Sequence, residues 1–166
     1  MKKSRLERLI AQFNKKELKN LQKFVASPYF NSQQGLSELL NYCISNPTPV
    51  FDKEAAYKAI FPTKKFNESD FRLHKSYLYR LIEKYIAYEE IEKKIASLLE
   101  EYVKPAVEQD GGNIKFLNYH EGIVKVLLQG ACSGCPSSTM TLKSGIQNLL
   151  NQMLPGQIQS VEAVNG

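Results

Sequence analysis

Apolar residues recur every three or four positions through residues 1–93, which is the spacing of helices that bury one face. Helix-capping residues divide this pattern into separate segments. Asn14 stands three positions before Glu17 and predicts the start of a second helix, Asp52 caps a short later helix, and Asn67 caps the longest one. The expected buried stripe of this longest helix comprises Phe71, Leu78, Leu81, Ile82, Tyr85 and Tyr88. The first half of the chain is therefore predicted to be all-α.

The pattern changes in the second half. Residues 114–119 and 123–128 alternate between apolar and polar positions around His120-Glu121-Gly122, which predicts a β-hairpin. A helix follows, and residues 157–164 are expected to supply a third strand. The face of this helix that covers the sheet is predicted to consist of Leu142, Ile146, Leu149 and Met153.

Together these patterns predict an α+β fold in two parts. Residues 1–93 form an all-α helical domain of unknown function, and residues 94–166 form a small α-β-β-α-β domain with a three-stranded sheet. Residues 83–102 contain no helix breaker, so one continuous helix is expected to cross the boundary. Pro105 removes one hydrogen bond and is expected to kink this helix.

Composition and charge restrict the function. The chain is 43% hydrophobic but holds no run of about 18 apolar residues, so no transmembrane helix and no membrane partner are expected. The net charge of +5 originates in residues 1–93, which hold 17 Lys and Arg against 11 Asp and Glu. The lysines are scattered among acidic residues, and this favours a solvated helix surface over a nucleic-acid interface. Nucleic acid is accordingly not predicted as a partner.

The cysteines indicate a reducing environment. Three cysteines are too few for a disulfide framework, and the basic start of the chain leads into an amphipathic pattern that is not typical of a secretory signal. The chain is therefore predicted to be cytoplasmic. Cys43 lies on an apolar stripe and is expected to be a small buried hydrophobic residue. His74 is expected at a helix surface, with no ligand-type residue at metal-binding spacing.

The residues with the clearest chemistry are Cys132 and Cys135, in a glycine-rich stretch before an amphipathic helix that Pro136 and Ser137 are expected to open. A C-x-x-C pair can bind one soft metal or close a small disulfide ring. Tetrahedral zinc and iron-sulfur sites need about four ligands, so a second copy of the chain could supply the other two. A dithiol redox pair, a zinc half-site shared between chains and an inert pair of buried thiols remain alternatives.

Three motifs occur in order along the second half. They are residues 104–113 (KPAVEQDGGN), residues 128–143 (LQGACSGCPSSTMTLK) and residues 161–164 (VEAV). Together they resemble the NifU-like (Nfu) carboxy-terminal domain, and the resemblance covers approximately residues 94–166.

The resemblance implies an iron-sulfur protein. In that family the C-x-x-C cysteines of two subunits together hold a 4Fe-4S cluster, which is passed on to apo-proteins. It therefore implies Cys132 and Cys135 as the cofactor and metal ligands, a cluster shared between two chains, a homodimer when cluster-loaded, and apo iron-sulfur proteins as cluster acceptors. It gives no other residue a ligand role.

A second similarity concerns the first half. Residues 23–31 (KFVASPYFN), residues 60–62 (IFP) and the helix expected over residues 71–88 are similar to the amino-terminal part of helical proteins of unknown function from Bacteroidetes. This similarity implies no activity.

No enzymatic motif accompanies the cysteines. The sequence holds no P-loop, dinucleotide fingerprint or Ser/His/Asp set, so the protein is not predicted to be an enzyme. The predicted function is an iron-sulfur cluster scaffold or carrier. The alternative is a helical module that binds protein or nucleic acid and dimerises through a zinc-bridged or vestigial C-x-x-C unit.

Overall fold

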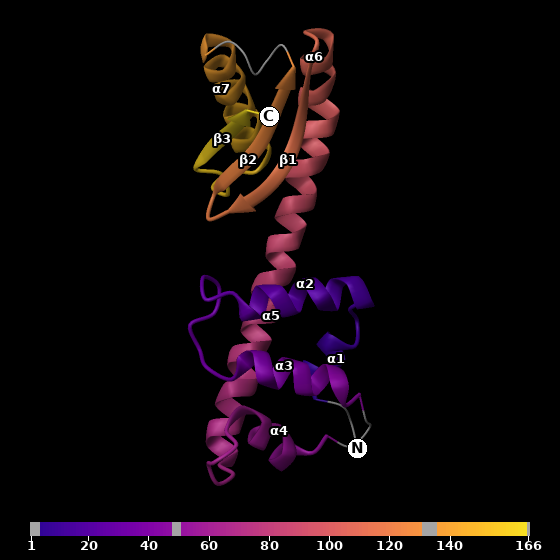
Figure 1. Cartoon of the computed structure of the whole chain (residues 1–166), viewed down its shortest axis with the longest axis vertical. Helices are drawn as coiled ribbons and strands as arrows, with labels where there is room; N and C mark the ends of the chain where they lie inside the picture. Colours follow the sequence, from indigo (N-terminus) through magenta and orange to yellow (C-terminus); the bar gives the residue numbers. More distant parts are fainter. Residues whose placement is uncertain (1–3, 48–50, 131–135, 166) are drawn as a thin grey trace. The chain divides into compact units, whose positions relative to one another are not determined.

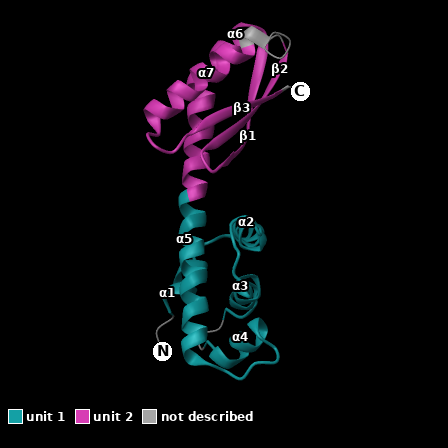
Figure 2. Cartoon of the chain, turned by 90° about the vertical axis from the view of Figure 1, so that its left-hand side faces the viewer, with its two compact units in different colours: residues 1–87 teal, residues 88–166 magenta. Residues whose placement is uncertain are grey.

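A computed structural model describes residues 4–47, 51–130 and 136–165, with the side chains of residues 136–138 and 165 left out. The chain divides into two compact units, residues 1–87 and residues 88–166 (Figure 2). The first unit is helical, and the second combines helices with a three-stranded sheet (Figure 1). The predicted α+β fold class is therefore confirmed.

The described helices of the first unit begin at a capping side chain, except the third, which follows Gly35 without one. Asn14 accepts hydrogen bonds from the backbone N–H groups of Lys16 and Glu17, and the Asp52 carboxylate does the same for Glu54 and Ala55. These bonds satisfy N–H groups that have no acceptor within the helix. The helices are α1 (Arg5–Ile10), α2 (Lys15–Ala26), α3 (Leu36–Ser45), α4 (Lys53–Ile60) and α5 (Glu68–Leu98).

The core of the first unit mixes aliphatic and aromatic side chains. Tyr85 on α5 packs against Phe24 on α2 with ring centroids 5.3 Å apart, and Phe24 in turn stacks on Phe30 at 4.0 Å. Tyr57 and Phe71 join α4 to α5 through a further edge contact. Residues that lose nearly all solvent contact include Leu21, Val25, Leu39, Leu40, Leu78 and Ile82.

Helix α5 runs without a break past the boundary between the units, as predicted from residues 83–102. It continues as one π-helical turn, η1 (Leu99–Val103), and then as α6 (Lys104–Gln109). Before Pro105 the structure adds a feature that the sequence did not predict. The backbone N–H of Lys104 donates to the Leu99 carbonyl five residues earlier, so the widened turn precedes the proline that has no N–H to donate.

The second unit is built on a mixed sheet in the order β1-β2-β3. Strands β1 (Gly112–His120) and β2 (Ile123–Gly130) form the predicted antiparallel hairpin. Its turn is Glu121-Gly122, and both residues have positive φ angles, as a tight two-residue turn requires. His120, expected in the turn, is instead the last residue of β1. Strand β3 (Ser160–Asn165) pairs in parallel with β2 and begins three residues later than predicted.

One hydrophobic core holds this unit together. Val124, Val126 and Leu128 on β2 are fully buried, and helix α7 (Pro136–Met153) covers them with Ile146 and Leu150. The α5–η1–α6 run contributes Ile95, Leu99, Val103 and Val107 to the same core.

The prediction of the buried α7 face is wrong for one residue. Met153 is 48% exposed, whereas Leu150 and Leu154 are buried. The buried side chains Ile146, Leu150 and Leu154 recur every four residues, and this spacing leaves Met153 beside the stripe.

Tyr88 also differs from the sequence prediction, which placed it on the buried stripe of the first half. It packs against the core of the second unit, with its ring 5.7 Å from that of Tyr119. In a helix that crosses a domain boundary, apolar residues recur at the same helical spacing on both sides of the boundary. This spacing alone therefore does not show where one core ends and the next begins.

Within the described ranges, no helix is both long enough and apolar enough to span a membrane.

Candidate functional site

The C-x-x-C segment lies between two well-anchored elements of the second unit. Strand β2 ends at Gly130, and α7 begins at Pro136. Cys132 and Cys135 themselves lie outside the described residues, so their predicted ligand role stays a prediction.

The strand end that leads to the cysteines depends on close backbone contact. Gly130 pairs with Gly112 at the open end of the β1–β2 hairpin and has a φ of 76°. A Cβ atom at Gly130 would lie 2.7 Å from the carbonyl oxygen of Gly111. Only glycine accepts both the left-handed backbone and this approach. The sequence therefore sets the direction in which the chain leaves the sheet.

The helix after the segment begins at Pro136, as predicted. Proline suits the first helical position because its missing N–H would have no intrahelical acceptor there. The other N–H groups of the first turn carry the positive end of the helix dipole, which stabilises nearby negative charge. A thiolate close to this helix start would therefore be favoured over a thiol.

Strand β2 and helix α7, the two elements that flank the C-x-x-C segment in sequence, both pack into the hydrophobic core of the second unit. Leu128, two residues before the end of β2, is fully buried, and Ile146 and Leu150 hold α7 against the sheet.

An exposed apolar side chain lies close to the start of α7. Met140 is 72% exposed, the largest exposed fraction among the large hydrophobic residues that the structure describes. Methionine is flexible and polarisable, and it adapts to differently shaped partners.

The opposite end of the hairpin is held by polar contacts that no sequence pattern predicted. The Tyr88 hydroxyl donates to the Tyr119 carbonyl, the Tyr119 N–H donates to the Glu92 carboxylate at 3.1 Å, and the Tyr119 hydroxyl donates to the Gln157 carbonyl at 2.9 Å. Burial, reinforced by the charge of Glu92, raises the pKa of Tyr88. These partners are 27 to 38 residues apart in sequence, so no local pattern could have revealed them.

In the part of the chain that the structure describes, no three His, Cys, Asp or Glu side chains gather in a way that could hold a metal ion. Cys43 is 7% exposed, as predicted, and burial raises the pKa of its thiol to about 12. His74 does have an acidic neighbour, contrary to the sequence prediction. Its Nδ1 lies 3.3 Å from an Asp70 carboxylate oxygen and 2.8 Å from the Asp70 carbonyl oxygen, because residues four apart adjoin on a helix.

Comparison with known proteins identifies the second unit. Residues 95–162 match the family model of the NifU-like domain. The family resemblance inferred from the three motifs is thereby confirmed for these residues. The similarity of the first half to helical proteins from Bacteroidetes stays a prediction.

Curated relatives match a segment of similar length. Proteins named NFU1 iron-sulfur cluster scaffold homolog, mitochondrial, from Drosophila grimshawi, Drosophila persimilis and Drosophila ananassae are 49%, 49% and 50% identical over 70 residues. Those residues are 42% of this chain and 23%, 24% and 24% of the relatives. The chain thus spans about a quarter of the length of the relatives it matches.

The names of these relatives contradict the predicted cytoplasmic location. They point to mitochondria, and the prediction is therefore wrong. It rested on thiols that must stay reduced, and the need for reducing conditions does not separate one reducing compartment from another.

Proposed function

We propose that this chain is an iron-sulfur cluster scaffold or carrier. Cys132 and Cys135 bind a 4Fe-4S cluster together with the same two cysteines of a second chain. The cluster is cargo, and the protein delivers it to apo iron-sulfur proteins without catalysing a reaction of its own.

One observation supports this proposal above the others. The NifU-like domain at residues 95–162 contains the C-x-x-C pair between β2 and α7, and relatives that are about half identical over 70 residues are named iron-sulfur cluster scaffolds. The anchored strand end at Gly130 and the helix start at Pro136 are compatible with a thiolate pair at this place.

The number of thiols argues for two chains. A four-iron cluster takes about four cysteine ligands, and the segment offers two. Cys43 is a poor third ligand, because it is buried among apolar residues and its raised pKa keeps it protonated at neutral pH. A symmetric pair of chains completes the ligand set, and it also makes both halves of the site equivalent.

Transfer then requires only ligand exchange. A thiolate of the acceptor replaces Cys132 or Cys135 on an iron atom, and the released thiolate takes up a proton. The exchange is repeated until the acceptor supplies all the ligands, and no electron is transferred. Met140 offers the acceptor an exposed apolar contact close to the start of α7.

Anaerobic reconstitution of the full chain with ferrous iron and sulfide tests the proposal. We expect about two irons and two sulfides per chain, because a four-iron cluster is shared by two chains. Light scattering of the loaded protein should give the mass of a dimer. Incubation with an apo four-iron enzyme should then restore that enzyme's activity.

Cysteine variants provide the matched controls. Cys132→Ala and Cys135→Ala should lose iron and sulfide while the far-ultraviolet circular dichroism stays that of the parent. Cys43→Ala removes the third thiol, from the core of the first unit, and should load normally. Retention of the cluster in either C-x-x-C variant, or zinc without sulfide in the parent, would refute the proposal and favour the zinc-bridged dimerisation unit.

A further inference from the structure

The first unit contains a groove with no assigned function. Its volume is about 500 Å³, and it is lined from α1, α4 and α5. Leu6 and Phe71 are its buried apolar residues. The polar residues of its lining are Ser4, Arg5, Lys53, Glu68, Arg72, Lys75, Ser76 and Tyr79.

The lining is strongly basic. Four cationic side chains face the groove against the single carboxylate of Glu68. That carboxylate is engaged by Lys53, with the two charged groups 3.0 Å apart. Among the described residues, no carboxylate forms an ion pair with Arg5, Arg72 or Lys75. The positive charge of these three side chains is therefore available to a ligand.

The groove also has an apolar component beside its charges. The Lys75 ammonium lies 5.2 Å from the centre of the Phe51 ring and 5.8 Å from that of Phe71. The two rings contact the ammonium through cation–π interactions, which do not neutralise its charge. A ligand that combines negative charge with hydrocarbon would contact both features.

The groups on α5 form a line. Arg72, Ser76 and Tyr79 occupy one face of the helix, and at 1.5 Å per residue they extend over about 10 Å. Alternate side chains of an extended peptide are about 7 Å apart on one side. A peptide with acidic side chains along this line can therefore contact Arg72 together with the hydroxyl groups of Ser76 and Tyr79, whereas a single phosphate does not extend over this length.

We propose that this groove binds an acidic segment of a partner protein, through side-chain carboxylates paired with Arg5, Arg72 and Lys75. The hydroxyl groups of Ser76 and Tyr79 can donate further hydrogen bonds to these carboxylates. Arginine suits this task because its planar guanidinium binds a carboxylate through two parallel hydrogen bonds. The inference goes beyond cluster binding, because every residue it uses belongs to the helical first unit.

Fluorescence anisotropy of a labelled oligoglutamate peptide, titrated with the full chain at low ionic strength, tests this proposal. We expect saturable binding that weakens as salt is added, since salt screens exposed charges. A labelled oligoglutamine peptide should not bind. Unlabelled oligoglutamate should displace the probe at lower concentrations than inorganic phosphate does.

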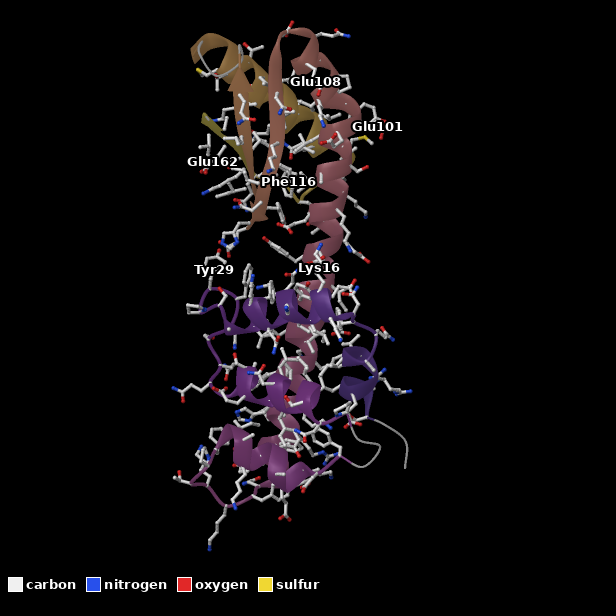
Figure 3. The ribbon with its side chains drawn as sticks, turned by 45° about the vertical axis from the view of Figure 1, so that its right-hand side comes forward. Lys16, Tyr29, Glu101, Glu108, Phe116 and Glu162 are labelled. Atoms are coloured by element: carbon white, nitrogen blue, oxygen red, sulfur yellow. The ribbon has the colours of Figure 1, made fainter. Side chains whose placement is uncertain are left out.

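A charge-matched pair of variants separates the groove from the net charge of the protein. Arg5→Gln combined with Arg72→Gln should weaken binding by about fivefold, as expected for the loss of two solvent-exposed ion pairs. Lys16→Gln combined with Lys19→Gln removes the same charge from exposed positions of α2 outside the groove, where Figure 3 shows Lys16, and should leave binding nearly unchanged. Thermal unfolding of both double variants should match that of the parent.

Three results would overturn the proposal. They are no saturable binding of oligoglutamate by the parent chain, equal weakening in the groove variant and the α2 variant, and displacement by phosphate at lower concentrations than by oligoglutamate. The last result would assign the groove to a phosphate ligand. The cluster-loading experiment is independent of all three, so either proposal can fail alone.

Discussion

The two units are stabilised by different kinds of interaction. In the first unit, short helices are started by their own side chains, such as Asn14 and Asp52, and aromatic rings fill much of the core. In the second unit, strands pair with one another over an aliphatic core, and partly buried hydrogen bonds around Tyr119 join helix α5 to strand β1. Local capping is readable from sequence because its partners are two or three residues apart. Long-range polar contacts are not, because their partners depend on the completed fold.

This comparison also separates two kinds of chemistry. The groove of the first unit is formed by long cationic side chains on three helices, whereas the cysteines of the second unit belong to a short segment between a strand and a helix. Each unit has its own buried core, so damage to one core should leave the chemistry of the other intact.

Core truncation tests this independence and should have the largest effect. Leu78→Ala in the first unit and Leu150→Ala in the second each remove a fully buried side chain and should cost about 3 kcal/mol. Hydrogen exchange followed by mass spectrometry should show lost protection mainly in the unit that carries the change. Leu150→Ala should impair cluster loading, and Leu78→Ala should not. Equal loss of protection in both units would mean that α5 couples them into one cooperative structure.

Gly130→Ala should have the next largest effect. The new Cβ would meet the Gly111 carbonyl oxygen at 2.7 Å, on a backbone with positive φ, and we expect a loss of about 2 kcal/mol. Chemical denaturation gives the change in stability. Gly145→Ala is the matched control, because nothing lies within 4 Å of a Cβ placed there in α7, and it should stabilise by about 0.5 to 1 kcal/mol. A neutral Gly130→Ala variant would contradict the close approach of the two strand ends.

Alkaline pH should destabilise the first unit through Cys43. Burial raises the pKa of its thiol from the usual 9.0 to about 12, so between these pH values the folded chain keeps a proton that the unfolded chain has released. Stability from this group is fully present below pH 9 and falls as pH rises, by at most about 1.4 kcal/mol per pH unit.

Denaturation of the parent and of Cys43→Ala at several pH values measures this contribution. The variant should be less stable at neutral pH, because it loses buried volume, and its stability should fall less steeply above pH 9. Parallel pH dependences would show that the thiol does not titrate differently in the folded chain.

The smallest effect is expected for Tyr119→Phe. It deletes the hydroxyl that donates to the Gln157 carbonyl at 2.9 Å and should cost about 1 kcal/mol. Tyr102→Phe, at a residue that is 52% exposed, is the control and should change stability by a few tenths of a kcal/mol. Thermal denaturation distinguishes the two variants, and identical melting temperatures would show that the Tyr119 bond contributes nothing.

Much of the fold follows from local rules in the sequence. Capping at Asn14, Asp52 and Asn67 gave three helix starts, and alternation around Glu121-Gly122 gave the hairpin. Each of these features depends on residues within a few positions of one another.

Features that depend on distant partners escaped prediction. The assignment of Tyr88 to the second core and the exposure of Met153 depend on which elements pack together, and the π-helical turn before Pro105 depends on how the helix lies against the sheet core. At the candidate site, Cys132 and Cys135 were found from their spacing and from family motifs. The glycine pair that positions the strand end became evident only from the register that brings Gly112 opposite Gly130.

The parallel pairing of β3 with β2 has a consequence for biosynthesis. Parallel neighbours need a crossover connection, and here α7 supplies it, with the C-x-x-C segment at its beginning. A nascent chain that has emerged only as far as Cys135 still lacks both α7 and β3, so its thiols are present before the scaffold that positions them. Iron captured by such a chain would be held by an unfinished domain. Under the proposed function, the cluster ligands therefore gain their complete structural setting only after α7 and β3 have been synthesised.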